Sequence, residues 1–290
     1  MTIMPRDIAE KVRIIGPVID PPATAAIYAS LQEQEPYRGV GVTRDVKYGP
    51  DPRHLLDVFE PEGSGGPRPV FMFVHGGGYV GGTKREPGSP FYDNIMLWAA
   101  RGGMVGVNMT YRLAPAHTWP AGPEDVAAAA RWVRLYIARH GGDPQRVVLF
   151  GHSAGATHAA TFAAMPRFHE PYGSGLAGLI LLSGNFDFAG AENNERFRAY
   201  VGEDPSKYAE RSPFQSIPRM PLPVMVAYAE LDPPGLYSQS ERLIAALREA
   251  ERAPRALKLN GHSHISITYA INSKDTELSD AMLDFIKSVT

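Results

Sequence analysis

Residues 151–155 read Gly-His-Ser-Ala-Gly, and they constrain the fold of this chain more than any other stretch. The apolar run Val147–Phe150 precedes them and the helix-like run Ala154–Ala164 follows. A short buried strand must here reverse sharply into a helix, and the two glycines lack the Cβ atoms that would clash as strand and helix approach. The pattern therefore predicts Ser153 at a strained apex, with its hydroxyl exposed near a helix N-terminus.

A second glycine-rich motif, His75–Gly78, directly follows the apolar run Val70–Val74. Three consecutive glycines expose backbone N–H groups that can reach a developing negative charge without interference from side chains. Such a loop can also cradle phosphate, but the spacing and the Gly-Lys-Ser/Thr ending of a P-loop are absent, and no G-x-G-x-x-G opens a helix. We therefore predict an oxyanion hole formed by the N–H groups of Gly77, Gly78 and Ala154.

Two carboxylates compete for the role of the acid that would orient a histidine base. The predicted strand Val224–Tyr228 is followed by Ala-Glu-Leu-Asp-Pro at positions 229–233. We favour Asp232 over Glu230, because Asp232 is fixed ahead of two prolines. Its carboxylate would hold the imidazole in place and stabilise the imidazolium.

Two histidines compete for the role of the general base. The predicted strand Ala256–Leu259 leads into a segment that contains His262 and His264, and the residues themselves leave both open. His152 is interpreted as a structural residue that points away from the adjacent serine. His75 is expected to brace the glycine loop through hydrogen bonds.

Alternating strand and helix patterns over about 200 residues predict a mostly parallel sheet with helices on both faces. The strand-like segments Val42–Tyr48 and Leu55–Glu60 are joined by a short turn, so we expect them to pair antiparallel at one edge of the sheet. Further strands are expected at 104–109 and 179–182, and helices at 91–101, 124–140, 237–251 and 277–289.

The expected organisation is one catalytic domain over residues 41–290, preceded by an N-terminal cap segment over residues 1–40. Residues 1–40 carry weak helical patterning broken by prolines, which suggests short helices wrapped over another part of the chain. Residues 185–221 are polar, charged and rich in aromatics, and they are too long for a simple connection between strands. We predict that they form a cap or lid insertion over the site.

Composition excludes several functional classes. The net charge of −2 gives no basic field for nucleic acid, and the absence of cysteine excludes disulfides and thiolate metal sites. No H-E-x-x-H metal motif occurs, so we expect neither metal nor cofactor. No apolar stretch reaches the roughly 18 residues of a membrane span, and Met1–Asp20 has no signal-peptide pattern. A cytoplasmic location is the default expectation. The oligomeric state stays open, with a homodimer as one alternative.

Four motifs together resemble the hormone-sensitive-lipase-like carboxylesterases. They are His-Gly-Gly-Gly at 75–78, Tyr-Arg-Leu-Ala-Pro at 111–115, Gly-His-Ser-Ala-Gly-Ala at 151–156 and Glu-Leu-Asp-Pro at 230–233. The resemblance spans residues 42–290 and implies an α/β-hydrolase fold with a small cap and cofactor-free hydrolysis of small-molecule esters. It further implies Ser153 as nucleophile and Asp232 as acid, with the glycine loop as oxyanion hole. The chain order of serine, acid and histidine agrees.

The segment after the last strand departs from that family's usual His-Gly-Phe. It reads His-Ser-His-Ile-Ser at 262–266, which is more similar to the arylformamidase branch, where the active histidine precedes an apolar residue. This comparison selects His264 as the base. We therefore expect a serine carboxylesterase for small to medium esters, with an arylformamidase or amidase as the alternative. A non-catalytic ligand-binding relative is disfavoured, because the triad and the glycine loop are complete.

Overall fold

The computed structural model describes residues 4–63 and 65–290. Residues 1–3 of the expected cap segment and Ser64 lie outside the described residues. Within the described residues, one sheet of eight strands has the order β1-β2-β4-β3-β5-β6-β7-β8. The strands are β1 (Val40–Lys47), β2 (Leu55–Pro61), β3 (Arg68–Val74), β4 (Val105–Met109), β5 (Gly142–His152), β6 (Gly178–Leu182), β7 (Val224–Leu231) and β8 (Arg255–Ser263).

The sheet is mostly parallel, as the alternation of strands and helices predicts. Strand β2 runs antiparallel to both of its neighbours, and the pairs from β4 to β8 are parallel. The predicted antiparallel pair at one edge is confirmed as β1 and β2. Because parallel strands all end at one edge of the sheet, the loops after β3, β5, β7 and β8 gather there.

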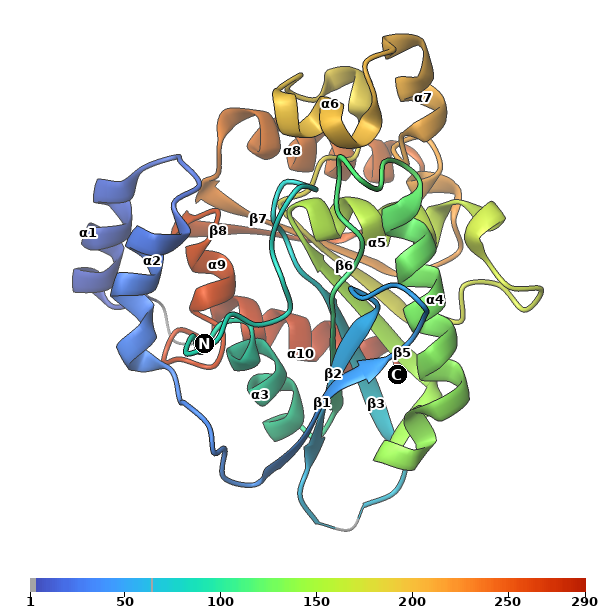
Figure 1. The fold of residues 1–290 in the computed structure, drawn as a ribbon. Helices are drawn as coiled ribbons and strands as arrows, with labels where there is room; N and C mark the ends of the chain where they lie inside the picture. The colour runs from blue at the N-terminus through green and yellow to red at the C-terminus, as the bar shows by residue number, and fades with distance from the viewer. Residues whose placement is uncertain (1–3, 64) are drawn as a thin grey trace.

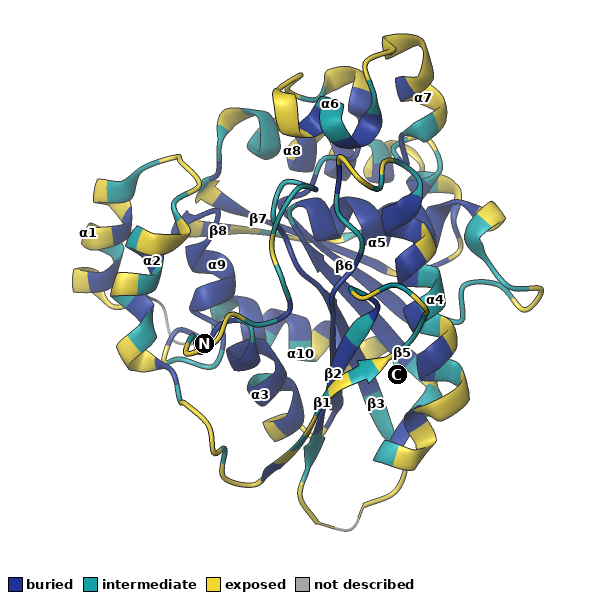
Figure 2. Cartoon of the chain, viewed as in Figure 1, coloured by how far each residue is buried: buried dark blue, intermediate teal, exposed yellow. Residues whose placement is uncertain are grey.

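Helices cover both faces of the sheet (Figure 1). Successive strand residues point to opposite faces: Val70 and Met72 pack with α4, α5 and α8, whereas Phe71 and Phe73 pack with α3 and α10. The sheet is therefore buried on both sides, and exposed residues gather on the outer helices and loops (Figure 2). These helices are α3 (Asp93–Arg101), α4 (Ala121–Tyr136), α5 (Ala154–Ala164), α8 (Pro234–Glu249) and α10 (Glu277–Val289).

The remaining α-helices belong to the two predicted cap segments and to the loop after β8. Helices α1 (Arg6–Ile15) and α2 (Pro21–Tyr28) pack beside β8 and α9 (Ser266–Tyr269), while α6 (Glu195–Val201) and α7 (Tyr208–Arg211) lie within the 185–221 segment. Among the described residues, no helix combines the length and apolar composition that crossing a bilayer requires. Short 3-10 turns occupy Ala29–Leu31, Ile137–His140, Pro166–Phe168, Phe188–Gly190, Pro205–Lys207 and Ile217–Arg219.

A buried ion network fixes the loop that follows the glycine-rich motif. The carboxylate of Asp57 on β2 accepts from Lys84 Nζ at 2.6 Å and from Arg44 Nη1 at 2.8 Å. It also accepts from the Asp45 N–H at 2.8 Å. Asp57 is fully buried and Lys84 nearly so. The network therefore ties the loop that carries Lys84 to the edge of the sheet.

We expect Asp57→Ala to lower the free energy of unfolding by about 2–3 kcal/mol, because the buried Lys84 keeps only Asp45 as a carboxylate partner and Arg44 loses one of its three. Urea denaturation followed by circular dichroism measures the loss. The matched control is Asp284→Ala, which removes the exposed pair with Arg255 at 3.3 Å and should cost less than about 1 kcal/mol. Equal losses in the two variants would contradict a stabilising role for the buried network.

Candidate active site

Ser153 occupies the sharp turn between β5 and α5. Its backbone adopts φ 57° and ψ −124°, a strained conformation for a residue with a side chain. Its N–H donates to the Leu182 carbonyl at 2.9 Å, which ties the turn to β6. A Cβ on Gly155 would overlap the Val74 carbonyl oxygen, so only glycine lets α5 pack this closely on β3. The half-buried serine side chain lines the pocket.

Asp232 and His264 lie together at the ends of β7 and β8. His264 Nδ1 is 2.7 Å from Asp232 Oδ1, and both side chains are fully buried. The second carboxylate oxygen, Oδ2, accepts from Ser183 Oγ at 2.6 Å and from the Ala229 N–H at 2.9 Å. These contacts hold Asp232 in one orientation, so that a single oxygen faces the imidazole.

The competing acid and histidine are engaged elsewhere. Glu230 is exposed and accepts from the Gly261 N–H at 2.6 Å. His262 Nε2 lies 3.0 Å from Asp275 Oδ2, and its Nδ1 lies 3.1 Å from Ser266 Oγ. Neither side chain lines the pocket that contains Ser153.

The glycine-rich loop adjoins the serine. A methyl group built on Gly76 would lie 3.0 Å from Ser153 Cβ. Gly77 and Gly78 have φ values of 129° and 60°, and a Cβ on Gly77 would overlap the Gly81 carbonyl oxygen. His75 braces this loop as expected, because its Nδ1 lies 2.6 Å from the Gly76 carbonyl oxygen.

All the candidate residues except Asp232 border one pocket of about 920 Å³. Its lining includes Ser153, His264, the glycine loop and Ala154, as well as residues from both predicted cap segments. His264 Nε2 is buried and has no hydrogen-bond partner among the described residues, Ser153 Oγ included. An imidazole nitrogen that shares a pocket with a serine hydroxyl can accept its proton once the two are within hydrogen-bond distance, and such contacts are often long before substrate binds.

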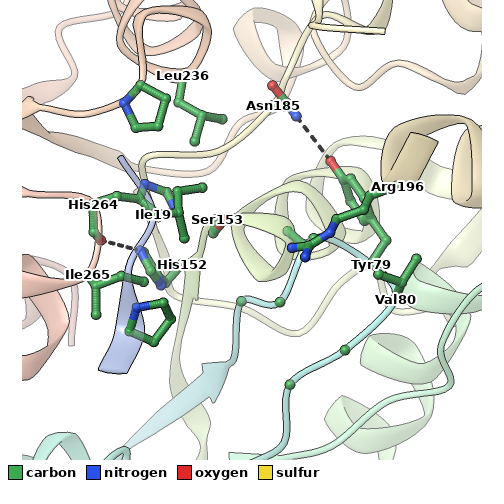
Figure 3. Close-up of a pocket in the computed structure, with 18 of the residues that line it drawn as sticks. Ile19, Tyr79, Val80, His152, Ser153, Asn185, Arg196, Leu236, His264 and Ile265 are labelled. Atoms are coloured by element: carbon green, nitrogen blue, oxygen red, sulfur yellow. Dashed lines mark hydrogen bonds between the residues drawn. The ribbon is translucent and has the colours of Figure 1, made fainter. Parts of the chain in front are cut away.

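His152 makes a structural contact, as the sequence led us to expect. Its Nε2 lies 2.9 Å from the His264 carbonyl oxygen, and its side chain also lines the pocket that contains Ser153 (Figure 3). A carbonyl accepts only, so His152 Nε2 carries the proton. Burial and the neighbouring His264 hold the pKa of His152 well below its ordinary value, which keeps the ring neutral. The contact links the serine turn to the His264 loop.

The 185–221 segment contributes to the polar side of the pocket. Asn185 follows β6 and its amide donates to the Tyr79 hydroxyl at 3.4 Å. Arg196 and Phe197 come from α6, whose N-cap Asn194 accepts from the Phe197 N–H at 3.0 Å. Sequence reasoning did not single out Tyr79, which directly follows the glycine-rich motif, or Asn185 and Arg196 in the charged segment, since isolated polar residues carry no motif.

Comparisons with known proteins agree with this architecture. The profile of a family with the α/β-hydrolase fold matches residues 71–268. Esterase LipQ of Mycobacterium tuberculosis is 31% identical over 84% of this chain, and Esterase LipC of the same organism is 29% identical over 76%. The chain covers 62% and 59% of these two proteins, less than two thirds of either.

Solved structures share the fold over the whole chain. A hyperthermophilic esterase from Pyrobaculum calidifontis has a TM-score of 0.74 and 23% identity, and covers 99% of each chain. A bacterial heroin esterase has the same TM-score and identity, covering 100% of this chain and 98% of its own.

Proposed function

This chain belongs to the α/β-hydrolase fold family, and from that premise we propose that it is a serine carboxylesterase acting through Ser153. The motifs of this chain resemble those of hormone-sensitive-lipase-like carboxylesterases, and this accords with the esterases among the relatives of the chain. The proposed catalytic residues are Ser153, His264 and Asp232, and the proposed oxyanion donors are the N–H groups of Gly77, Gly78 and Ala154.

One juxtaposition carries the proposal. The imidazole of His264 is held by Asp232 through Nδ1 at 2.7 Å, and its Nε2 is left without a partner beside the pocket that Ser153 lines. Because the carboxylate fixes the proton on Nδ1, Nε2 keeps its lone pair and is the acceptor for the serine proton. An ordinary surface pair of carboxylate and histidine would not be fully buried with one imidazole nitrogen left unbonded at a pocket.

Acylation begins when Ser153 Oγ attacks the ester carbonyl carbon while its proton passes to His264 Nε2. The carbonyl oxygen takes up the negative charge of the tetrahedral intermediate, and the C–O bond to the alcohol then breaks. His264 returns the proton to the departing oxygen, which leaves as a neutral alcohol.

Deacylation repeats these steps with water in place of the serine. His264 Nε2 removes a proton from water, whose oxygen attacks the acyl carbon and displaces Ser153 Oγ. The proton returns to the serine and the carboxylic acid leaves. In both steps the glycine loop and Ala154 would stabilise the oxyanion, and the loss of one such donor typically costs about 2.7–4 kcal/mol.

The reaction predicts a clear preference between two substrates on one purified sample. For phenyl butyrate, a short-chain aryl ester, we expect kcat/KM of about 10^4 M⁻¹s⁻¹ or more, within the ordinary range of enzymes. For N-formylaniline, an N-formyl aryl amide, we expect no measurable turnover. Initial rates over a range of concentrations give kcat/KM for both substrates. An equal or higher kcat/KM on the formamide would instead support the arylformamidase alternative.

A further inference from the structure

Apolar side chains line part of the pocket around Ser153. Ile19, Leu236 and Ile265 lie on the same side of Ser153 as His264 (Figure 3). Under the proposed function, His264 must hand its proton to the departing oxygen of the ester, so the alcohol lies on this side. Its surroundings favour an apolar alcohol.

The other side carries a cation. The Arg196 side chain extends from α6 over the glycine loop toward Ser153 (Figure 3). A methyl group built on Gly78 would lie 3.1 Å from Arg196 Cδ and 3.5 Å from its Nη1, so the absence of a side chain at Gly78 gives the arginine room. The Asn185 amide lies on the same side, where it contacts the Tyr79 hydroxyl.

Arg196 is exposed, and no described residue pairs with it. Within residues 4–63 and 65–290 its guanidinium makes no ion pair and no hydrogen bond. By contrast, Arg198 on the same helix pairs with Glu203 at 3.4 Å. Among the described residues that line the pocket, Arg196 is also the only lysine or arginine. An unpaired guanidinium directed into a pocket is suited to a ligand carboxylate, which it can bind through two parallel hydrogen bonds.

Three carboxylates share the pocket lining and limit how this recognition can work. Glu86, Glu192 and Glu195 border the same pocket, so its overall field does not attract anions from a distance. Glu192 lies toward the start of α8, where its Cβ is 3.8 Å from a methyl group built on Gly235. Recognition by Arg196 must therefore be a short-range contact made by an already bound substrate.

We infer that Arg196 binds a carboxylate on the acyl part of the substrate, so that the preferred esters join an apolar alcohol to an acyl chain bearing a free carboxylate. The inference rests on the proposed function, because the acyl side is defined by attack from Ser153 and protonation by His264. It extends that function to a substrate class: monoesters of dicarboxylic acids.

The test compares two esters with the same leaving group and acyl length, monophenyl adipate and phenyl hexanoate. For the wild-type chain, Arg196→Met and Arg196→Lys, we would measure kcat/KM for both esters and take the adipate-to-hexanoate ratio. Arg196→Met should lower this ratio by about 10- to 100-fold, as expected for the loss of a hydrogen-bonded charge. The ratio for Arg196→Lys should fall between those of wild type and Arg196→Met, because lysine keeps the charge but lacks the planar guanidinium.

Arg198→Met is the matched control, since it removes a cation from the same helix outside the pocket lining, and it should leave the ratio unchanged. If wild type cleaves phenyl hexanoate but Arg196→Met keeps the wild-type ratio, or Arg198→Met lowers it equally, the inference about Arg196 is wrong and the esterase proposal stands. If wild type cleaves neither ester above the buffer rate, the proposed function itself fails.

Discussion

Ser153→Ala is expected to lower kcat/KM for phenyl butyrate by about 10^4-fold or more while leaving the chain folded. The hydroxyl is the proposed nucleophile, and removing one member of a triad typically removes nearly all the catalysis that the triad provides together. Steady-state kinetics measures the loss. Circular dichroism and thermal unfolding should match wild type, because the half-buried serine side chain makes no hydrogen bond to any described residue that an alanine would break.

A neighbouring serine supplies the control for this prediction. Ser89 also lines the pocket, but it comes from the loop before α3 and not from the turn after β5. Ser89→Ala should change kcat/KM far less than Ser153→Ala. If Ser153→Ala keeps most of its activity and another serine variant loses it, the nucleophile is that other serine and not Ser153.

Asp232→Asn is expected to lower kcat by about 10^4-fold through a specific change of tautomer. In wild type, Oδ2 of Asp232 accepts from both Ser183 Oγ and the Ala229 N–H. The asparagine must place its oxygen there, so its NH₂ group faces His264 Nδ1. His264 then accepts at Nδ1 and carries its proton on Nε2, where it can no longer act as a base.

Glu230→Gln is the matched control, because it makes the same chemical change two positions away. Its amide oxygen can still accept from the Gly261 N–H, and Glu230 is exposed and far less constrained. We expect kcat within about 3-fold of wild type, as is usual for surface substitutions with small free-energy effects. The kcat values of the two variants, measured on one ester, decide between the acids. A larger loss in Glu230→Gln would assign the acid to Glu230.

The sequence predicts the sheet and the sharp turn at Ser153 well because local patterns determine them. A continuous apolar run such as Val70–Val74 is typical of a strand buried on both faces, and Ala154–Ala164 is a helix with the predicted bounds. Element ends are less determined: β5 begins at Gly142, although Gly-Asp-Pro is a poor strand signal. Residues at the start of β5 are in the strand because they pair with β3, and local strand propensity does not predict this.

The choice between neighbouring candidates depends on contacts between distant residues. His262 and His264 look equivalent in sequence, and His262 is occupied by Asp275, which lies in a later loop. Asp232 accepts a hydrogen bond from Ser183, which follows β6, and no local sequence pattern predicts this contact. Whether residues 1–40 and 185–221 act as caps stays a prediction, although Ile19 and Arg196 from these segments border the pocket.

Covalent labelling tests the central claim most directly. The purified chain would be treated with a fluorophosphonate, which reacts with an activated serine, and then digested and mapped by mass spectrometry. We predict one adduct, on the peptide that contains Ser153, with loss of esterase activity in proportion to labelling and no adduct in Ser153→Ala. An unlabelled Ser153 in an active enzyme, or an adduct on a different serine, would contradict the account.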